Sequence, residues 1–466
     1  MPELPEVETF KKALEPALLN RTIQSINLIY EKTISTNKDE FLSILKNKKI
    51  TKLGRKGKFL LFFLSSPYVL ISHLRMEGKF FVEPKEEKRK KHDLVEFNLD
   101  NDTKLVYNDV RKFGFIGLYK ASSYLKDSPL SNLGKEPFEI SKEELFIGLH
   151  KRKAEIKEAL LDQTIMSGLG NIYDDEVLFD CKINPRTPSN QISLSQAQNI
   201  ISSSIKILNK AIEKNGSTIK SFHFKENQNG DMQNFLKVYG KEHTPCPNCL
   251  NLFHKIKIGG RGTTYCPYCQ ENPYRPFVIG ITGPIHSGKS TASNYFLKKG
   301  FVIFDADKEV ANLYKQEVIK KHLIDLFGKD VINKNEIDKA KLTHLLQDKN
   351  NKKALMDYLY PILYKKAEEF INKASSNVIL DVPLLYSSHL DNLTDFVILI
   401  DSNLENRKSR IEKEGRDSIS LLKINATYPL NFVKKKASII IDNDQGLLNL
   451  YKQLDLIKIP NGYKYQ

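Results

Sequence analysis

Short apolar or alternating runs, separated by glycines and charged turns, fill the chain from about Thr22 to Tyr119. The clearest of them cover residues 59–64, 68–74, 94–99 and 113–119. Runs of this length and period are typical of antiparallel strands, so we predict a β-sandwich. The segment before them has carboxylates in its first turns, which predicts a helix that runs to about Leu19.

Helical periodicity follows, in residues 151–166, 171–180 and 193–215. A tight turn, Gly168-Leu-Gly170-Asn171, precedes the second of these segments. We therefore predict a small helical domain. A glycine-rich turn that directs a helix N-terminus outward is also a common phosphate-binding device, but alone it is a weak signal.

Strand and helix patterns alternate in the C-terminal part. Near-continuous apolar runs cover residues 277–282, 301–304, 378–380, 396–400 and 438–441. Crossovers of a dozen or more residues between such runs predict a parallel sheet with helices on both faces. Asp305, Asp307 and Asp381 stand at the ends of the second and third runs. They either face a ligand at the carboxyl edge of the sheet or cap the helices that follow.

Four of the five cysteines form two CxxC knuckles, Cys246-Pro-Asn-Cys249 and Cys266-Pro-Tyr-Cys269. This spacing delivers four thiolates tetrahedrally to one Zn²⁺. Four protein ligands leave no open coordination position, so we expect one structural zinc. The remaining Cys181 has no partner cysteine, and this usage fits a reducing compartment better than a disulfide framework.

A second site follows the knuckles closely, in the segment from Gly283 to Ser290. Its sequence, GPIHSGKS, matches the GxxxxGK[ST] loop, and an apolar run directly precedes it. In such a loop the backbone N–H groups bind phosphates, the lysine binds the outer phosphates and the serine binds Mg²⁺. We place the joint between the metal domain and the phosphate-binding domain at residues 270–276, and we expect the two to have separate cores.

Length and composition are consistent with several folded domains. The 466 residues favour about three domains, and 40% hydrophobic residues suffice for packed cores. No apolar stretch approaches the roughly 18 residues of a membrane helix, and the N-terminus lacks the layout of a signal peptide, so we expect a cytoplasmic protein with no membrane partner. The net charge of +16 suggests a polyanion partner, although lysine-rich surfaces are often only solvated.

The first residues, MPELPEVE, allow two interpretations. One is an ordinary helix start, with proline in the first turn and acids near the helix dipole. The other begins from Pro2. Removal of Met1 would expose a secondary amine that can attack an electrophilic carbon and form an iminium, with Glu3 and Glu6 close enough for proton transfer.

Seven ordered motifs between residues 2 and 270 resemble the bacterial formamidopyrimidine-DNA glycosylases. They are the Pro-Glu-Leu-Pro-Glu-Val-Glu start, RKGK ending at Lys58, HLRMEG from His73, KHD around His92, DVRKFG from Asp109, GLGNIY from Gly168 and GRGTTY from Gly260. This resemblance implies a base-excision enzyme in which a β-sandwich, a helix-two-turn-helix domain and a zinc finger grip damaged double-stranded DNA. It also favours the nucleophilic interpretation of Pro2.

The resemblance assigns roles to individual residues. Pro2 would attack C1′ of the damaged nucleotide, Glu3 would donate a proton, Glu6 would be a second carboxylate and Lys58 would assist elimination. The expected contacts to the DNA backbone are His92, Arg111, Lys157, Asn171 and Arg261. The wedge that replaces an extruded base would be Met76, Arg111 and Phe113. This wedge set favours oxidised purines, such as 8-oxoguanine and formamidopyrimidines, over oxidised pyrimidines.

The part from residue 277 to about 455 resembles dephospho-coenzyme A kinase through the phosphate loop, Asp305-Ala-Asp307, Tyr360-Pro361, Asp381-Val-Pro-Leu-Leu385 and Ile441-Asp-Asn-Asp444. This implies phosphoryl transfer from ATP to dephospho-coenzyme A, with Mg²⁺ and with Asp305 or Asp307 as the base. The implied ATP-binding residues are Gly283, His286, Ser287, Gly288, Lys289 and Ser290, with Arg410 and Arg416 in a lid. Three departures stand out, because the family usually has glycine at 284 and 286 and histidine at 360.

The combined prediction is a multidomain α+β and α/β chain, and we expect a monomer. Its parts are a β-sandwich (1–135), a helix-two-turn-helix domain (136–240), a four-cysteine finger (241–270), a linker (271–276) and a P-loop α/β kinase-like domain (277–466). Two alternatives remain open at this point. One is an active glycosylase with a degenerate nucleotide-binding module, and the other is a catalytically silent DNA-binding protein.

Overall fold

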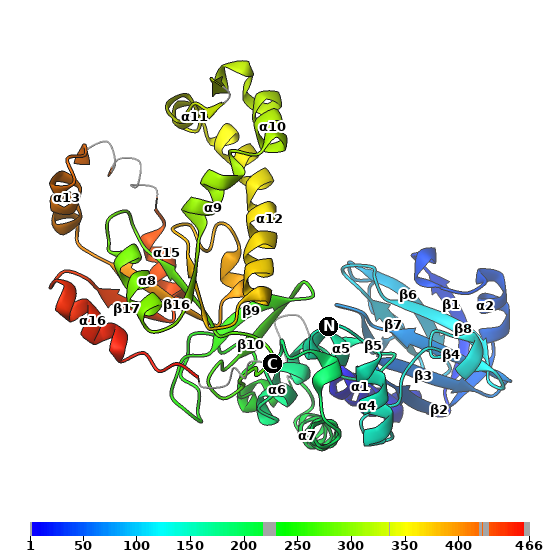
Figure 1. Ribbon diagram of the computed structural model, residues 1–466. Helices are drawn as coiled ribbons and strands as arrows, with labels where there is room; N and C mark the ends of the chain where they lie inside the picture. Colours follow the sequence, from blue (N-terminus) through cyan, green and yellow to red (C-terminus); the bar gives the residue numbers. More distant parts are fainter. Residues whose placement is uncertain (1, 218–229, 335, 419–421, 423–427, 461–466) are drawn as a thin grey trace. The chain divides into compact units, whose positions relative to one another are not determined.

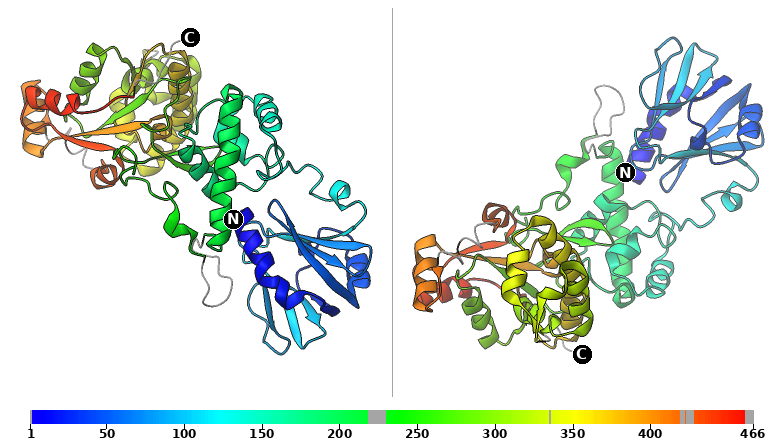
Figure 2. Two further views of the ribbon diagram at one scale, coloured as in Figure 1. Left: turned by 90° about the horizontal axis from the view of Figure 1, so that it is seen from below. Right: turned by 90° about the horizontal axis from the view of Figure 1, so that it is seen from above.

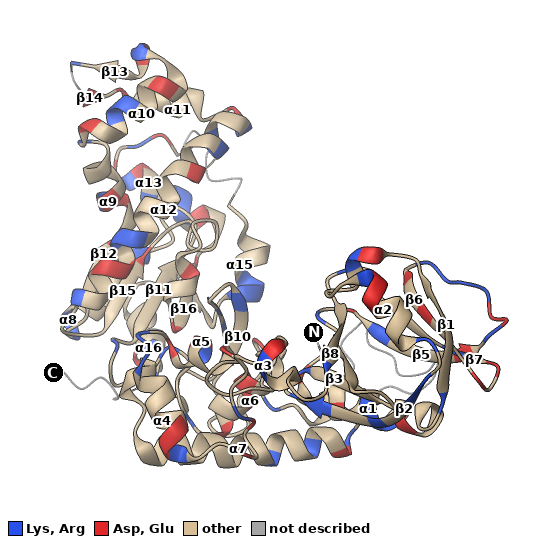
Figure 3. Ribbon diagram, turned by 90° about the vertical axis from the view of Figure 1, so that its right-hand side faces the viewer, with Lys and Arg blue, Asp and Glu red and all other residues tan. Residues whose placement is uncertain are grey.

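The computed structural model describes residues 2–217, 230–334, 336–418, 422 and 428–460 (Figure 1). The chain forms two compact units, Met1–Tyr239 and Gly240–Gln466. The zinc finger therefore groups with the rest of the second unit, from residue 277 onward, which we call the C-terminal module. Lysines and arginines are interspersed with acidic residues in both units (Figure 3). No helix among the described residues has the length and apolar character needed to cross a membrane.

The first unit begins with an antiparallel β-sandwich, as predicted. Its strand order is β5-β7-β6-β1-β2-β3-β4-β8, and β1 pairs with β2 over only two residue pairs where the two halves join. The strands are β1 (Thr22–Leu28), β2 (Lys48–Lys56), β3 (Phe59–Leu64), β4 (Tyr68–His73), β5 (Lys79–Pro84), β6 (Asp93–Leu99), β7 (Thr103–Asn108) and β8 (Phe115–Lys120). Short helical segments, η1 (Glu31–Thr33), α2 (Lys38–Leu45) and α3 (Tyr124–Asp127), complete this part.

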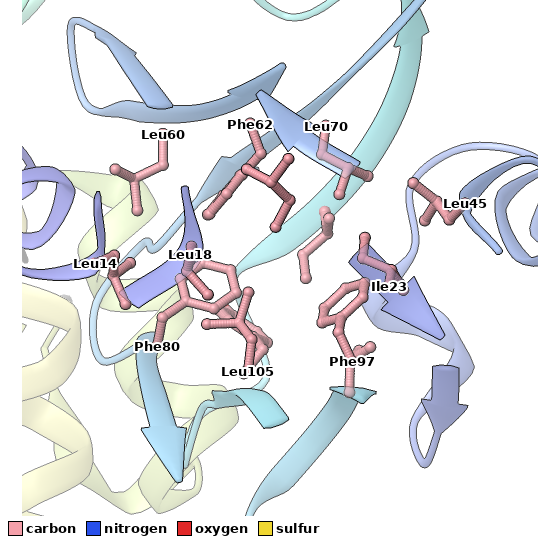
Figure 4. Packing of buried hydrophobic residues seen from close by; sticks show 14 of the residues in the cluster. Leu14, Leu18, Ile23, Leu45, Leu60, Phe62, Leu70, Phe80, Phe97 and Leu105 are labelled. Carbon is pink, nitrogen blue, oxygen red and sulfur yellow. The ribbon is translucent and has the colours of Figure 1, made fainter. Parts of the chain in front are cut away.

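Helix α1 (Leu4–Leu18) packs on the core of the sandwich, beside the blue strands in Figure 2. Its Leu14 and Leu18 meet inward-facing strand residues such as Phe62, Phe80 and Phe97 (Figure 4). Burial of each such side chain contributes about 1.5–3 kcal/mol, which fixes the helix against the strands. The N-terminal end of α1 is thereby held in one position.

The helical part of the first unit contains α4 (Lys142–His150), α5 (Ile156–Leu161), α6 (Asn171–Asp180), η2 (Ser189–Gln191), α7 (Leu194–Glu213) and η3 (Met232–Phe235). The predicted helix over 151–166 is wrong in extent. Glu155 is extended and bridges to Pro188, and Asp162 ends the helix because its carboxylate accepts the N–H and hydroxyl of Thr164. Leu4 of α1 belongs to the core of this helical part.

The second unit begins with the finger hairpin, β9 (His254–Ile258) and β10 (Arg261–Tyr265). A five-stranded sheet of order β12-β15-β11-β16-β17 follows, and every pairing in it is parallel, as predicted. The strands are β11 (Val278–Thr282), β12 (Val302–Asp305), β15 (Val378–Asp381), β16 (Phe396–Asp401) and β17 (Ile439–Asp442).

Helices cover both faces of this sheet (Figure 1). One face buries a cluster with α9 (Ala306–Leu313), α12 (Lys349–Lys373) and α15 (Leu430–Lys436), and the other buries a cluster with α8 (Lys289–Lys298) and α16 (Leu447–Asp455). The remaining described elements are α10 (Glu317–Phe327), η4 (Lys329–Val331), β13 (Ile332–Asn333), β14 (Glu336–Ile337), α11 (Lys339–Leu345), η5 (Leu390–Leu393) and α13 (Leu404–Lys413). The layers place the carboxyl ends of the strands at one edge, where a ligand site is expected.

Candidate functional site

The carboxylate of Glu3 lies at the N-terminus of α6. It accepts backbone N–H groups from Gly170 at 2.7 Å, Ile172 at 2.8 Å and Tyr173 at 3.3 Å. Gly170 is required there, because a Cβ atom would lie 2.4 Å from the Glu3 carboxyl carbon. The unpaired N–H groups of a helix start stabilise an anion, so α6 positions this carboxylate.

Glu6 is held by an equally dense set of donors. It accepts the N–H of Glu3 at 2.8 Å, the hydroxyl of Tyr173 at 2.6 Å and the N–H of Ser217 at 2.8 Å. Burial raises the pKa of Tyr173 well above its ordinary value, so its hydroxyl remains a donor. Sequence reasoning missed Ser217, which lies 211 residues from Glu6 and carries no local signal.

Lys58 is buried at the same site, and its ammonium donates to the carbonyl of Leu169 at 2.6 Å. Burial raises the pKa of Glu3, and the positive charge of Lys58 partly opposes this rise. A buried carboxyl group whose pKa is raised can hold a proton closer to neutral pH, which is what a general acid needs. The structure thus brings Glu3, Glu6 and Lys58 together beside the buried Pro2.

The turn that carries Lys58 is fixed by a residue that the sequence did not single out. Glu136 accepts the N–H of Gly57 at 2.7 Å and forms a two-pronged ion pair with Arg55, at 2.5 and 2.9 Å. Arg55 also donates to Glu8 of α1 at 3.0 Å. Such paired contacts fix the geometry of an arginine, so the turn is held against α1.

Lys157 does not lie where a contact to the DNA backbone requires. Its side chain is fully buried, and its ammonium lies 2.6 Å from the carboxylate of Asp175, 3.5 Å from that of Asp174 and 3.2 Å from the carbonyl of Asn171. The expectation of a direct phosphate contact is therefore wrong in this conformation, because the charge is already paired inside the protein. Lys157 instead supports the start of α6, where Asn171 is the first residue.

The predicted wedge residues lie on two turns of the sandwich. Met76 follows β4, while Arg111 and Phe113 lie between β7 and β8; Met76 is 42% and Phe113 57% exposed. The carboxylate of Asp109 accepts the N–H groups of Arg111, Phe113 and Gly114 at 2.8 to 3.0 Å. The guanidinium carbon of Arg111 lies 4.9 Å from the centre of the Phe113 ring. These turns hold apolar and cationic side chains in solvent, as a base-replacing wedge requires.

His92 and Arg261 occupy different units. His92 has a left-handed backbone (φ 75°), is half-buried, and its carbonyl accepts the N–H of Asp109. Arg261 is exposed at the start of β10, directly after the turn at Gly259 and Gly260.

The four knuckle cysteines converge in the second unit. Their sulfur atoms all lie within 4.8 Å of one another, with 3.8 Å between Cys246 and Cys269 and 3.5 Å between Cys249 and Cys266. A tetrahedron of Zn–S bonds of about 2.3 Å needs sulfur atoms about 3.8 Å apart. The cluster therefore fits a structural zinc ion.

The phosphate loop connects β11 to α8 as the motif predicts. Gly283 and Gly288 are required there, since a Cβ on either would lie 2.2 Å from Ile400 O or Asn443 Nδ2, respectively. The hydroxyl of Ser287 is buried and has no hydrogen-bond partner among the described residues. An unsatisfied donor at a helix N-terminus fits a bound phosphate.

Two cations of this site hold the loop itself. Lys289 donates to the carbonyls of Gly283 and Pro284 at 3.0 and 3.1 Å. Arg410, on α13, donates to the carbonyls of His286 and Ser287 at 3.0 and 3.2 Å. Arg410 therefore fixes the loop carbonyls in this structure, and its lid role stays a prediction.

Arg416 differs from Arg410, because it is exposed and lies 3.6 Å from Glu414. His286 has a φ of 55°, a left-handed conformation that is strained for a non-glycine residue.

The sequence left two roles open for the acids at the strand ends, which were to cap a helix or to face a ligand. Both roles occur. Asp305 caps α9 by accepting the N–H of Lys308 at 3.0 Å. Asp307 lies in the first turn of α9, and its charge acts on Lys289, as does that of Asp381. Asp381 accepts the hydroxyl of Ser293 at 2.8 Å. Asp307 is thus the better candidate for a base, while Ser290, next to Lys289, is exposed.

Comparisons with protein families define the class of each part. The formamidopyrimidine-DNA glycosylase N-terminal domain matches residues 1–116, and the helix-two-turn-helix domain of the same glycosylases matches residues 133–223. A zinc finger found in these glycosylases and in isoleucyl-tRNA synthetase matches residues 245–272. The dephospho-CoA kinase family matches residues 277–449. The first three matches all come from glycosylase-type domains, and the fourth is a separate match to a kinase family.

Individual relatives identify the first part. The formamidopyrimidine-DNA glycosylase of Ligilactobacillus salivarius is 45% identical over 276 residues, which are 58% of this chain and 99% of that protein. The Lactobacillus helveticus enzyme is 43% identical over 272 residues, 58% of this chain and 99% of its own length. The chain belongs to the formamidopyrimidine-DNA glycosylase family.

A solved structure agrees with this assignment. Wild-type Lactococcus lactis Fpg, in complex with DNA that contains an N7-benzyl-Fapy-dG lesion, has a TM-score of 0.55 and 40% identity. The match covers 58% of this chain and 100% of that one.

Asp174 gives the active-site region a testable pH dependence. Burial raises its pKa from 3.8 to about 7. Between about pH 4 and pH 7 the folded protein therefore holds a proton that the unfolded chain has released, so this group makes stability fall as pH rises through that range. We expect Asp174→Asn to raise the melting temperature relative to wild type more at pH 8 than at pH 5, measured by thermal unfolding.

Asp180→Asn, at the more exposed end of the same helix, is the matched control and should show no such pH-dependent gain. If Asp174→Asn changed the melting temperature relative to wild type by the same amount at pH 5 and pH 8, the prediction would be contradicted.

Proposed function

We propose that residues 2–270 form a DNA glycosylase and abasic-site lyase that removes oxidised purines, with Pro2 as the nucleophile after removal of Met1. The buried carboxylate of Glu3, held by three N–H groups of α6 next to Pro2, is the observation that carries this proposal. Membership of the glycosylase family supports it independently.

The chemistry follows from the secondary amine of a free Pro2. Attack on C1′ breaks the bond to the damaged base, and protonation opens the sugar to leave an iminium. Glu3, whose pKa is raised by burial, supplies the proton. The iminium acidifies C2′, so the 3′ phosphate and then the 5′ phosphate leave by elimination, with the ammonium of Lys58 close to the reacting region.

The exposed turns supply the contacts to DNA. Met76, Arg111 and Phe113 would fill the space of the extruded base, and filling that space offsets a few kcal/mol of unstacking. His92, Asn171 and Arg261 would hold the backbone. A Lactococcus lactis relative was solved with Fapy-dG-containing DNA, and a ring-opened guanine of this kind belongs to the proposed substrate class.

Borohydride reduction tests the glycosylase directly. We expect a covalent protein–DNA adduct on duplex that contains 8-oxoguanine opposite cytosine, because reduction freezes an iminium. Pro2→Gly should cleave much less, and Glu3→Gln should lower base excision by about 10²-fold or more. Intact-mass analysis of the N-terminus is run on the same sample. Undiminished trapping of a chain that still carries Met1 would overturn the assignment.

We further propose that the P-loop domain, residues 277–466, acts as a dephospho-CoA kinase. The phosphate loop with the buried, unsatisfied Ser287 hydroxyl carries this proposal, together with the family match. Lys289 and the loop N–H groups would bind the phosphates of ATP, Ser290 would bind Mg²⁺ and Asp307 would accept the proton of the acceptor hydroxyl. Mg²⁺ would supply charge neutralisation between the phosphates.

A cavity of about 810 Å³ beside α12 is the candidate acceptor site. Lys349, Lys352 and Lys353 line it together with Tyr360 and Tyr364. Lysine ammonium groups beside aromatic rings suit a ligand that combines phosphates with a base, as dephospho-CoA does.

The strained loop gives the kinase proposal a specific test. We expect Mg²⁺-dependent ATP binding by calorimetry and modest phosphorylation of dephospho-CoA, both diminished in Lys289→Ala. Glycine at positions 284 and 286 together should raise kcat by up to about 10-fold, because it relieves the left-handed strain of His286 and restores an N–H. Absence of ATP binding would indicate a degenerate module instead. ATP binding without product, unchanged by the glycines, would refute this account of the loop.

A further inference from the structure

The inner ends of the finger strands are buried against the C-terminal module. Tyr265, the last residue of β10, has no exposed surface, and its hydroxyl donates to the carboxylate of Asp395 at 2.6 Å. His254 is its register partner on β9, and its Nε2 lies 3.5 Å from the hydroxyl of Thr394. Strand β9 contacts η5, which ends just before Thr394 and Asp395. The hairpin therefore joins the module at its base and extends Arg261 away from that base.

One carboxylate connects three segments of the second unit. Asp395 is 4% exposed, and besides the hydroxyl of Tyr265 it accepts the N–H of Val278 and the guanidinium of Arg275, both at 2.9 Å. Its own N–H donates to the carbonyl of Val278 at 2.8 Å. Arg275 was expected to belong to a linker, but its charge is paired with the module. Removal of either partner of a buried charge pair leaves the other unsatisfied, which is costly.

The second zinc knuckle also rests on the module. Tyr268 lies between Cys266 and Cys269, and its ring centre is 6.0 Å from that of Phe277 and 6.1 Å from that of Phe396. It packs against the core cluster that contains β11 and α8. A residue inside the zinc loop thus packs on the core of the nucleotide-binding module, although the finger's own buried residues form a separate small cluster.

The finger has little apolar core of its own. Its buried cluster consists of Ile256, Ile258 and Tyr265, and one of these three makes the contact to Asp395. A segment this small does not fold on hydrophobic burial alone and depends on metal or on a neighbouring surface. Here it has both.

We propose that the C-terminal module has a second function, as the folding platform of the zinc finger, so that finger and module unfold as one unit. In the Ligilactobacillus salivarius relative, the match takes in 99% of the protein, which leaves almost nothing to correspond to Asp395. The platform is thus a property that the fusion adds to the glycosylase. It makes the DNA-contacting hairpin dependent on the integrity of the kinase-like fold.

This arrangement couples ligand binding by the module to the stability of the zinc finger. Strand β11 begins at Val278 and β16 begins directly after Asp395, and their other ends flank the phosphate loop at Gly283 and Ile400. A ligand that binds only the folded module stabilises everything that unfolds with it. Mg²⁺-ATP should therefore slow the loss of zinc. This arm of the inference rests on the nucleotide binding proposed above, whereas the platform itself does not.

Zinc release from the full-length zinc-loaded protein tests the platform. The rate is followed with a chromogenic chelator in increasing urea, while unfolding of the module is followed by circular dichroism. We expect zinc release and module unfolding to share one midpoint in wild type. Tyr265→Phe, which removes one hydroxyl from the finger side, and Asp395→Asn should each release zinc at least about 10-fold faster, a change of about 1.4 kcal/mol, which is within the cost of a broken buried hydrogen bond.

Tyr274→Phe is the matched control, since Tyr274 is 42% exposed and lies in the same segment as Arg275. It should release zinc at the wild-type rate. Wild-type release rates in both Tyr265→Phe and Asp395→Asn, or zinc loss at a urea concentration at which the module remains folded, would overturn the platform.

Nucleotide is added in a second series, with ATP binding measured separately by calorimetry. Slower zinc release with Mg²⁺-ATP in wild type, and a smaller effect in Asp395→Asn, supports the linkage. If calorimetry detects ATP binding but zinc release does not change, the linkage is wrong. If calorimetry detects no binding, the nucleotide proposal fails and the urea series alone decides on the platform.

Discussion

The contact between the Glu3 carboxylate and the first N–H groups of α6 determines the geometry of the glycosylase half. It joins the start of α1, which packs on the sandwich, to the helical domain, whose core includes Leu4. Both partners lose their hydration on burial, so the arrangement is stable only if each polar group is satisfied. This explains why Gly170 lacks a side chain and why Glu6 is fixed by further donors. Pro2 is then placed by its neighbours along the chain.

Asp395 has a comparable role in the second unit. Its buried carboxylate accepts hydrogen bonds from the N–H of Val278 at the start of β11, from Arg275 of the joining segment and from Tyr265 at the end of β10. In each half, therefore, segments distant in sequence meet at an acidic side chain that is almost fully buried. Backbone N–H groups supply part of the compensation in both places, and a cation lies close to each carboxylate. Buried charges that are paired in this way resist substitution on either side.

The sequence was informative where the signal is local. The parallel strands are short apolar runs, the knuckles have fixed spacing and the phosphate loop has a defined motif, so each could be recognised without the fold. Contacts over long separations could not. Ser217 reaches Glu6 and Glu136 reaches Gly57 across 211 and 79 residues, and nothing in the intervening pattern marks them. The helix over 151–166 was predicted too long because its apolar period continues past Asp162, where side-chain hydrogen bonding ends it.

Lys157 illustrates a second reason for failure. A lysine next to apolar residues gives no indication of whether its ammonium reaches solvent, and the two carboxylates that pair with it come from a different helix. Likewise, no local sequence signal indicates that Arg410 donates hydrogen bonds to the carbonyls of the phosphate loop. Because these carbonyls are held by a guanidinium, the left-handed backbone of His286 is maintained by hydrogen bonds from α13 rather than by glycine. The substitution at 286 and the position of Arg410 are therefore parts of one structural solution, in which a strained loop is kept in shape before any phosphate binds.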